Sequence, residues 1–455
     1  MRAAFILIFS FLLFSCSEVK EDAPLIERDP DEIYSGGATT SFDQTSKAFT
    51  FPLSNISSQD LISHNEGDGA FEATFVSPPA QINGGLGPIF NNTSCVSCHN
   101  RDGRARPPLS NEAFGGLLFR ISGQGADANG GPMAVPGFGL QIQTHSIFGV
   151  QPEMDIQISY SEISGEFADG SDYSLQQPNY TIANSYISVP EGTMISPRIA
   201  NPNFGLGLLE AVADETILNF ADEFDNNGDG ISGKANYVYD FAKDKLVLGR
   251  FGWKASQPTL VQQSAAAANN DMGVTSGYFP SETSFGQTQD VPSHDPEMSA
   301  SDLDAIVVYL QTLAPPARRN VSDGAVMTGK ALFAQAKCSA CHIPKMKTGS
   351  HTINELSNQI IRPYTDLLLH DMGEGLADNR PDYKASGREW RTAPLWGIGL
   401  TKIVNGHTNF LHDGRARNLS EAILWHGGEA ENAKQSFLKM NTADRSVLIK
   451  FLESL

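Results

Sequence analysis

The sequence predicts a mainly α-helical chain built from two similar units, the first of which carries a large insertion of loops and β-strands. A short motif with two cysteines and a histidine occurs twice, near residue 95 and near residue 338. An amphipathic helix pattern follows each copy at a distance. The long stretch after the first copy contains segments in which apolar and polar residues alternate, as they do in strands.

The two copies of the motif are "CVSCH" and "CSACH". Two cysteines three positions apart, followed directly by a histidine, are the attachment pattern of c-type haem. The cysteines would then form thioethers to two haems and each histidine would be a proximal iron ligand. The residues concerned are Cys95, Cys98 and His99 in the first motif, and Cys338, Cys341 and His342 in the second. A thioredoxin-like thiol pair and a zinc site made from both pairs are the alternatives, and neither gives the histidines a role.

The N-terminus has the features of an export signal. "MRAAFILIFSFLLFSC" contains one arginine and an apolar run that is too short to span a bilayer. "LFSC" resembles a bacterial lipobox, which predicts a lipoprotein signal peptide over 1–16 and lipidation of Cys16; the alternative is a plain signal peptide. Residues 17–45 then form an acidic flexible tether. We expect a protein of the bacterial cell envelope, on the periplasmic face or the cell surface, that meets the membrane only through its lipid anchor.

Composition narrows the classes of partner. The chain has 455 residues, a formal net charge of −20 and 40% hydrophobic residues, enough to fill real cores. The charge argues against nucleic acid and against an anionic membrane as partners. Cysteine pairs occur only in the two motifs, so no structural disulfide is expected. The 42 glycines and 25 prolines indicate many turns and long loops between helices.

Each motif is followed by a closing helix. The pattern predicts one helix over 301–313 behind an N-cap at Ser301, and another over 443–455. Their ends match as "YLQTL" and "FLESL". The proline-rich "APPARRN" between the first helix and the second motif is a natural boundary.

Two cytochrome c-like units follow from this layout, over 46–314 and 320–455. A phenylalanine lies five positions before each motif, Phe90 in one and Phe333 in the other. The first unit is far longer, and its alternating stretches at 154–167 and 180–189 predict the strands of the insertion.

Several longer segments carry a resemblance to a known family. They are "GLGPIFNNTSCVSCHNRDGRA", "FGLGLLEAV", "GRFGWKASQPTL", "DMG", "EWRTAPLWG" and "FLHDGRARNLSEAILWHGGEA". From about residue 60 to its end the chain resembles the di-haem oxidoreductases, which are labelled putative peroxidases or thiol oxidoreductases. That family is related to bacterial di-haem cytochrome c peroxidases and to the enzyme that matures methylamine dehydrogenase.

The resemblance implies catalytic residues on the first unit. In the peroxidase relatives a tryptophan lies between the haems, a glutamine follows about ten positions later and a glutamate about ten after that. Trp253, Gln263 and Asp271 match this order, although Asp replaces Glu and arrives two positions early. Glu210 is a second candidate acid. The structural alternatives are a core aromatic for Trp253 and a turn cap for Asp271.

The resemblance also points to a distal ligand for the second haem. Where the relatives carry a methionine ligand, "LSEAILWHG" places His426, which we expect at the last turn of a helix. The competing histidines in the same unit are His370, His407 and His412. For the first haem we expect an open or water-bound face, with His145 as the one nearby candidate ligand.

A calcium site is a further candidate. "DNNGDGISGKAN" places Asp225, Asn227 and Asp229 at the first three ligand positions of a calcium loop, and the carbonyl of Ile231 at the next. Position 12 is Asn236 where a bidentate glutamate is usual, and an Asn/Gly-rich turn is the alternative.

Together these expectations describe an oxidoreductase with two covalently bound haem c groups and a candidate Ca²⁺. Peroxide would react at the first haem, and electrons would pass through the second from a donor protein of the cell envelope. The alternative is a non-catalytic di-haem carrier that passes electrons between a donor and an acceptor protein. A thiol oxidoreductase would need cysteines that hold no haem.

Overall fold

The computed structural model describes residues 29–109, 112, 115–290 and 296–455. The predicted signal peptide over 1–16, with the lipidation site Cys16, lies outside the described residues. Within them, no helix is both long enough and apolar enough to cross a membrane.

The prediction of a mainly α-helical fold is wrong. Helices account for 30% and strands for 18% of the structure, and two cytochrome c-like units are not evident in the described residues. Among the eleven α-helices of the described chain, six have fewer than ten residues. The physical reason is the glycine and proline content, which ends helices early and leaves most of the chain in loops between short elements.

The α-helices are α1 (Ser58–Glu72), α2 (Cys95–Cys98), α3 (Leu206–Glu210), α4 (Asp214–Leu218), α5 (Leu260–Met272), α6 (Ala300–Thr312), α7 (Gly324–Gln335), α8 (Thr401–Asn405), α9 (Leu419–Leu424), α10 (Glu431–Lys439) and α11 (Thr442–Ser454). The strands are β1 (Ile89–Phe90), β2 (Leu117–Ser122), β3 (His145–Ser146), β4 (Asp155–Glu166), β5 (Asp172–Ala183), β6 (Met194–Ile199), β7 (Tyr237–Asp240), β8 (Lys245–Leu248), β9 (Met346–Lys347), β10 (Ile360–Ile361), β11 (Leu369–Asp371) and β12 (Glu389–Arg391). They pair in twos as antiparallel ladders: β1 with β3, β2 with β6, β4 with β5, β7 with β8, β9 with β10, and β11 with β12.

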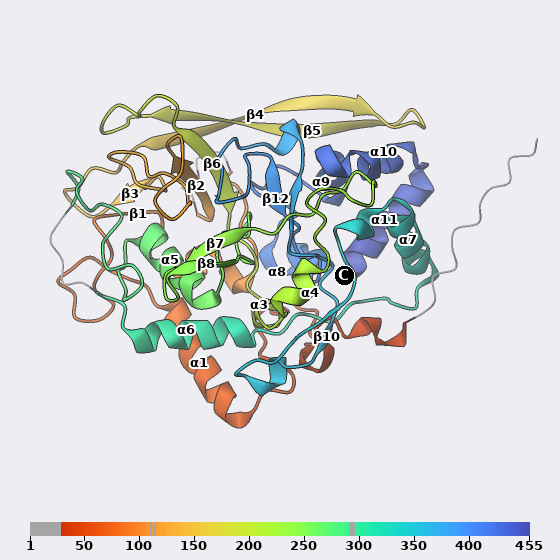
Figure 1. Ribbon diagram of the computed structural model, residues 1–455, viewed down its shortest axis with the longest axis horizontal. Helices are drawn as coiled ribbons and strands as arrows, with labels where there is room; N and C mark the ends of the chain where they lie inside the picture. The colour runs from red at the N-terminus through yellow and green to blue at the C-terminus, as the bar shows by residue number, and fades with distance from the viewer. Residues whose placement is uncertain (1–28, 110–111, 113–114, 291–295) are drawn as a thin grey trace, which may run out of the picture.

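Two crossing helix pairs lie on opposite sides of the molecule, α1 with α6 and α7 with α11 (Figure 1). Each crossing needs a glycine, because a Cβ at Gly67 would collide with the carbonyl oxygen of Ala305. A Cβ at Gly329 would likewise collide with that of Val447. The closing helices predicted from the sequence are confirmed to within one residue at each end, since they are α6 and α11. The N-cap of α6 is Ser299 rather than Ser301.

The long hairpin β4–β5 runs along one edge of the molecule (Figure 1). It confirms the strand predicted over 154–167, whereas of the stretch 180–189 only residues 180–183 belong to a strand, which begins at Asp172 and ends at Ala183. Its tip reaches the C-terminal region, where Phe167 packs edge-on against Phe437 of α10 and the N–H of Ala168 donates to the Leu438 carbonyl. The hairpin therefore bridges the regions that carry the two motifs.

The acidic tether predicted over 17–45 is too long, because the chain is packed from Asp29 onward. Asp29 forms an ion pair with Arg362 at 2.7 Å. Buried Glu32 pairs with both Arg318 and Lys330, which lie on either side of the start of α7. These pairs fix the segment against the connection between α6 and α7.

That connection is the proline-rich segment predicted to separate two units. Residues 314–318 are buried, and the Ser35 hydroxyl donates to the Pro316 carbonyl at 2.6 Å. The N-terminal segment thus covers the predicted boundary. The division into units over 46–314 and 320–455 stays a prediction.

Candidate haem sites

The first motif forms one wall of a cavity of about 350 Å³. Cys95 and Cys98 lie at the two ends of the single turn α2, and His99 follows as its C-cap. The Nδ1–H of His99 donates to the Asn201 carbonyl at 2.8 Å, which leaves Nε2 with a free lone pair. Burial lowers the pKa of His99 to about 4, so the imidazole is neutral at physiological pH. A buried neutral imidazole oriented by a backbone carbonyl is the usual form of a histidine that binds a metal.

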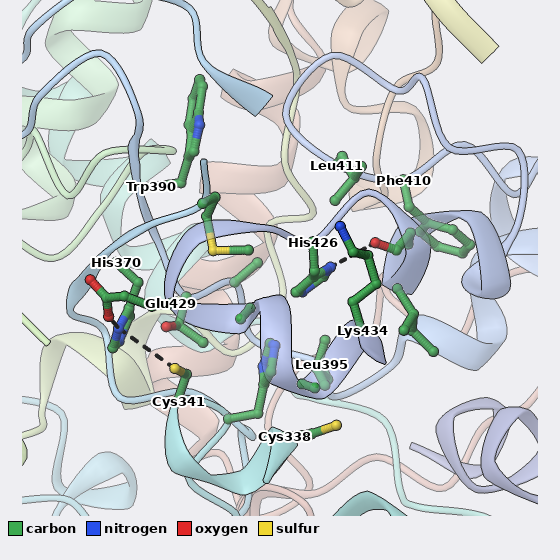
Figure 2. Close-up of a pocket in the computed structure, with 18 of the residues that line it drawn as sticks. Cys338, Cys341, His370, Trp390, Leu395, Phe410, Leu411, His426, Glu429 and Lys434 are labelled. Atoms are coloured by element: carbon green, nitrogen blue, oxygen red, sulfur yellow. Dashed lines mark hydrogen bonds and ion pairs between the residues drawn. The ribbon is translucent and has the colours of Figure 1, made fainter. Parts of the chain in front are cut away.

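The second motif repeats this arrangement beside a cavity of about 200 Å³. Figure 2 shows Cys338 and Cys341 along one side of that cavity. His342 donates from Nδ1 to the Tyr364 carbonyl at 3.0 Å, and burial lowers its pKa to about 4. Both motifs therefore offer two thiols and one free imidazole nitrogen to a cavity, which fits a covalently attached haem.

The alternatives to haem fit the structure less well. The two cysteine pairs line different cavities, whereas a joint zinc site would need them together. Burial raises the pKa of Cys95 and of Cys338 to about 12, so neither thiol is ionised near neutral pH. A redox-active thiol pair needs an accessible thiolate, which these sites disfavour.

A shared wall separates the two cavities. The residues that line both are Arg104, Trp253, Arg391, Ala393 and Pro394. Of the tryptophans in the described residues, only Trp253 belongs to this wall. Its indole N–H donates to the Ile199 carbonyl at 2.8 Å, which fixes the plane of the ring. The structure therefore places Trp253 between the cavities. Trp253 also belongs to a hydrophobic core cluster, which agrees with the alternative interpretation of this residue as a core aromatic.

Helix α5 brings the other two predicted catalytic residues to the first cavity. It begins behind Thr259, whose side chain caps the Gln262 N–H, and it ends at Gly273 in the left-handed conformation. Gln263 and Asp271 lie about two turns apart along it, and both line the cavity.

Asp271 is held at both its backbone and its side chain. Its carbonyl accepts from the backbone N–H groups of Asn91 and Asn92, just before the first motif. One carboxyl oxygen accepts from the Gln141 amide at 2.8 Å. Burial raises the pKa of Asp271, and the Arg120 guanidinium and the Gln141 hydrogen bond partly oppose that shift. A carboxyl group with a raised pKa, facing a cavity, is suited to take up and release protons.

Glu210 lies outside the residues that line either cavity. It accepts from the Leu260 N–H at 2.8 Å, at the start of α5, and from the Gln311 amide at 2.6 Å. Its contacts thus join α3, α5 and α6, which is a structural role. His145 also lies outside the first cavity, stacked on Phe90 across the ladder of β1 and β3.

His426 shares the pattern of the two motif histidines. It lies two residues beyond α9, which ends at Leu424, earlier than the sequence predicted. Its Nδ1–H donates to the Ala422 carbonyl at 2.7 Å, and Figure 2 shows His426 at the second cavity. His342 lines the same cavity. Burial lowers the pKa of His426, so Nε2 carries a free lone pair.

The competing histidines are less available. His370 has both ring nitrogens occupied, by Glu429 at 2.7 Å and by Asp366 at 2.8 Å. His407 donates from Nε2 to the Arg104 carbonyl while its Nδ1 accepts from a backbone N–H. His412 is stacked on Trp390 with 3.9 Å between ring centroids. The hydrogen bonds therefore exclude His370 and His407 but not His412, whose Nε2 lies 3.8 Å from the Asp413 carboxylate. His426 is favoured over His412 because a backbone carbonyl orients its ring, whereas the His412 ring is held by its stacking on Trp390.

Side chains of the candidate calcium loop accept hydrogen bonds from backbone N–H groups of the same loop. Asp225 accepts from the Gly230 N–H, and Asn227 and Asp229 each accept from the N–H two residues later. Asn236 does not join them, because its amide is buried and donates to the carbonyls of Lys254 and Asp382. Within the described chain, the one tight grouping of three metal-type ligands lies elsewhere, at Cys341, Asp366 and His370.

The internal repeat differs from the one read in the sequence. Phe333 lies on α7, 6.3 Å from the His342 ring, and packs on Phe451 of α11. Its spatial counterpart is Phe71 on α1, 6.2 Å from the His99 ring, rather than Phe90, which lies on strand β1. Only the pairing of α1 with α6 reveals this equivalence, since the loop between α1 and the first motif has no counterpart after α7.

Comparison with known proteins agrees with these sites. The family model described as "di-haem oxidoreductase, putative peroxidase" matches residues 30–455, nearly the whole chain. No curated protein sequence matches the chain. Two cavities, each with a C-x-x-C-H motif and an available imidazole, are what such a family needs, and the chain belongs to the di-haem oxidoreductases.

Proposed function

We propose that the protein is a di-haem c-type peroxidase, with peroxide reduced at the first cavity and electrons delivered through the second. His99 and His342 would hold the two haem irons, and Cys95, Cys98, Cys338 and Cys341 would bind the macrocycles. The bound haem supplies a redox-active iron that binds peroxide and exchanges electrons. The reaction consumes one peroxide, two protons and two electrons and yields two waters. The electrons would come from a donor protein of the cell envelope.

The observation that carries this proposal is the difference between the two cavities. The first has Gln263 and the half-buried carboxyl Asp271 on one helix, with His99 as its only histidine among the described lining residues. The second has a further free imidazole nitrogen, on His426, in addition to that of His342. An acid that can shuttle protons serves peroxide cleavage, and a closed, doubly ligated site serves electron transfer.

The residues around the first cavity each have a task in this proposal. Asp271 would accept the proton of bound peroxide and return it to the departing oxygen, while Gln141 orients its carboxyl group. Arg120 would stabilise the charged carboxylate. Gln263 would donate a hydrogen bond to the substrate. Trp253, between the two cavities, would shorten the path for electrons.

Mixing the purified protein with hydrogen peroxide and a reduced electron donor tests the function. A peroxidase oxidises the donor in proportion to the peroxide consumed, two electrons for each peroxide. A non-catalytic carrier exchanges electrons with the donor but leaves the peroxide concentration unchanged, and that result would contradict the proposal.

We further propose that both haems are covalently attached and that the loop containing Asp225, Asn227, Asp229 and the Ile231 carbonyl binds Ca²⁺. Under denaturing conditions, the mass of the chain should exceed that of the polypeptide by two haem groups. Under native conditions one further calcium ion should be present, and a chelator should remove it. Unmodified motif cysteines would contradict covalent attachment and revive the thiol oxidoreductase. An unchanged mass after chelation would contradict the calcium site.

The export of the protein stays a proposal as well. A lipid on Cys16 would anchor it to the membrane at the periplasmic face or the cell surface. Metabolic labelling with a fatty acid should label the wild type and not a Cys16→Ser variant.

A further inference from the structure

Two arginines of the wall between the cavities are buried without a carboxylate partner. Arg104 and Arg391 are each 8% exposed. Among the described residues, no carboxylate forms an ion pair with either guanidinium. The other buried arginines near the cavities are paired, as Arg380 is with Asp382 at 3.0 Å. A buried cation without a counter-ion is costly, so its presence indicates an anion that binds in the folded protein.

The energetic cost of burial without a partner is greater for Arg104 than for Arg391. Its Nη1 is buried without a hydrogen-bond partner. The guanidinium lies between two aromatic rings, 5.8 Å from the centre of Trp253 and 5.4 Å from that of Phe410. Its backbone is fixed too, since the N–H donates to the Asn405 side chain and the carbonyl accepts from His407. The side chain is therefore held in the wall, with hydrogen-bond capacity unused.

Arg391 flanks the same tryptophan from β12. Its backbone N–H donates to the Trp253 carbonyl at 2.9 Å, and its Nε donates to the Gly252 carbonyl at 2.8 Å. The Nη1 of its guanidinium group donates a long, 3.4 Å hydrogen bond to the Thr392 carbonyl. The nearby carboxylate Asp366 is already bonded to His370. The Arg391 guanidinium is thus anchored by backbone carbonyls, whereas that of Arg104 is held beside two aromatic rings, and within the described chain neither has a carboxylate partner.

We infer that Arg104 and Arg391 bind carboxylate groups of the two haems, on either side of Trp253, and thereby raise the reduction potentials of both. Haem carries two propionate carboxylates, and the planar guanidinium fork binds a carboxylate through two parallel hydrogen bonds. Each arginine lines both cavities, so it can serve a ligand in either. A fixed positive charge beside the haem favours the form that carries one more electron. This inference rests on the proposed binding of haem, but not on peroxide as the substrate.

The test is the midpoint potential of each haem, measured by spectroelectrochemistry on the holoprotein. Arg104→Gln and Arg391→Gln should each lower the potential of at least one haem by about 59 mV, a tenfold change in its one-electron reduction equilibrium, while two haems remain bound. Arg250→Gln is the matched control, because Arg250 is as buried but pairs with Asp214 and lines neither cavity. Potentials equal to those of this control in both variants would overturn the inference.

Arg104→Lys covers the case in which the glutamine variant fails to fold. Lysine keeps the charge but loses the bidentate fork, so the paired carboxylate should take up a proton more readily. The potential should then depend on pH between about 5 and 8, where that of the wild type is flat. A flat profile in the lysine variant, with the wild-type potential, would also overturn the inference. A wild-type chain without two haems would instead contradict the proposed function, which keeps the two failures apart.

Discussion

Asp271→Asn should lower the rate of peroxide reduction by about 10²–10⁴-fold, the usual contribution of a positioned acid or base. Asparagine keeps the size of the side chain and can still accept from the Gln141 amide, so the cavity keeps its shape. It cannot carry a proton from one peroxide oxygen to the other. Stopped-flow mixing with peroxide measures the rate, and the haem content should equal that of the wild type.

The pH profile gives this prediction a second measurement. Asp271 must be ionised to accept a proton, so the wild-type rate should rise as pH increases through its raised pKa. That inflection should be absent in Asp271→Asn. Because a raised folded pKa makes the ionised carboxyl unfavourable in the fold, its contribution to stability is lost as pH rises through that pKa. The asparagine variant should therefore be no less stable than the wild type at neutral pH.

Asp127→Asn is the matched control for this experiment. Asp127 lines the same cavity, but its carboxylate accepts from the backbone N–H groups of Asn129 and Gly131, which an asparagine side chain also satisfies. The control should react with peroxide at the wild-type rate. An unchanged rate in Asp271→Asn, or an equal loss in both variants, would show that the proton shuttle lies elsewhere.

His426→Ala should convert the second haem from a low-spin to a high-spin signal in the EPR spectrum of the oxidised protein. The reason is that Nε2 of His426 is free while His370 and His407 use both ring nitrogens. Burial lowers the pKa of His426, so the ligand should persist at mildly acidic pH. His426→Met should raise the potential of this haem, because a methionine ligand raises it relative to histidine.

His412→Phe is the matched control for His426. His412 lines the same cavity, and phenylalanine can keep its stacking on Trp390. The low-spin signal should survive this substitution. If it survives in His426→Ala and is lost in the control, the distal ligand is His412, and the assignment of His426 is wrong.

The sequence by itself determined the features that depend on neighbours along the chain. The C-x-x-C-H spacing places two thiols and an imidazole on one short turn wherever it occurs, and α2 shows that turn for the first motif. Helices α6 and α11 were predictable to within a residue, because a long apolar face with a cap specifies a helix locally. Strand β4 was also predictable from local sequence, because its apolar and polar residues alternate.

Tertiary structure decided which residues share a cavity. Arg104, Trp253 and Arg391 come from three distant segments and meet only because the chain folds back on itself. Gln141 and Arg120, which contact or charge-stabilise Asp271, carry no signal in the sequence. The fold class was missed because glycine and proline shorten the helices, and the loops between them are held by contacts that local patterns do not specify. Backbone carbonyls of Asn201 and Tyr364 orient His99 and His342, and these partners are fixed only when separate segments pack together. The partner of His426, Ala422, is instead local, four residues earlier in the chain.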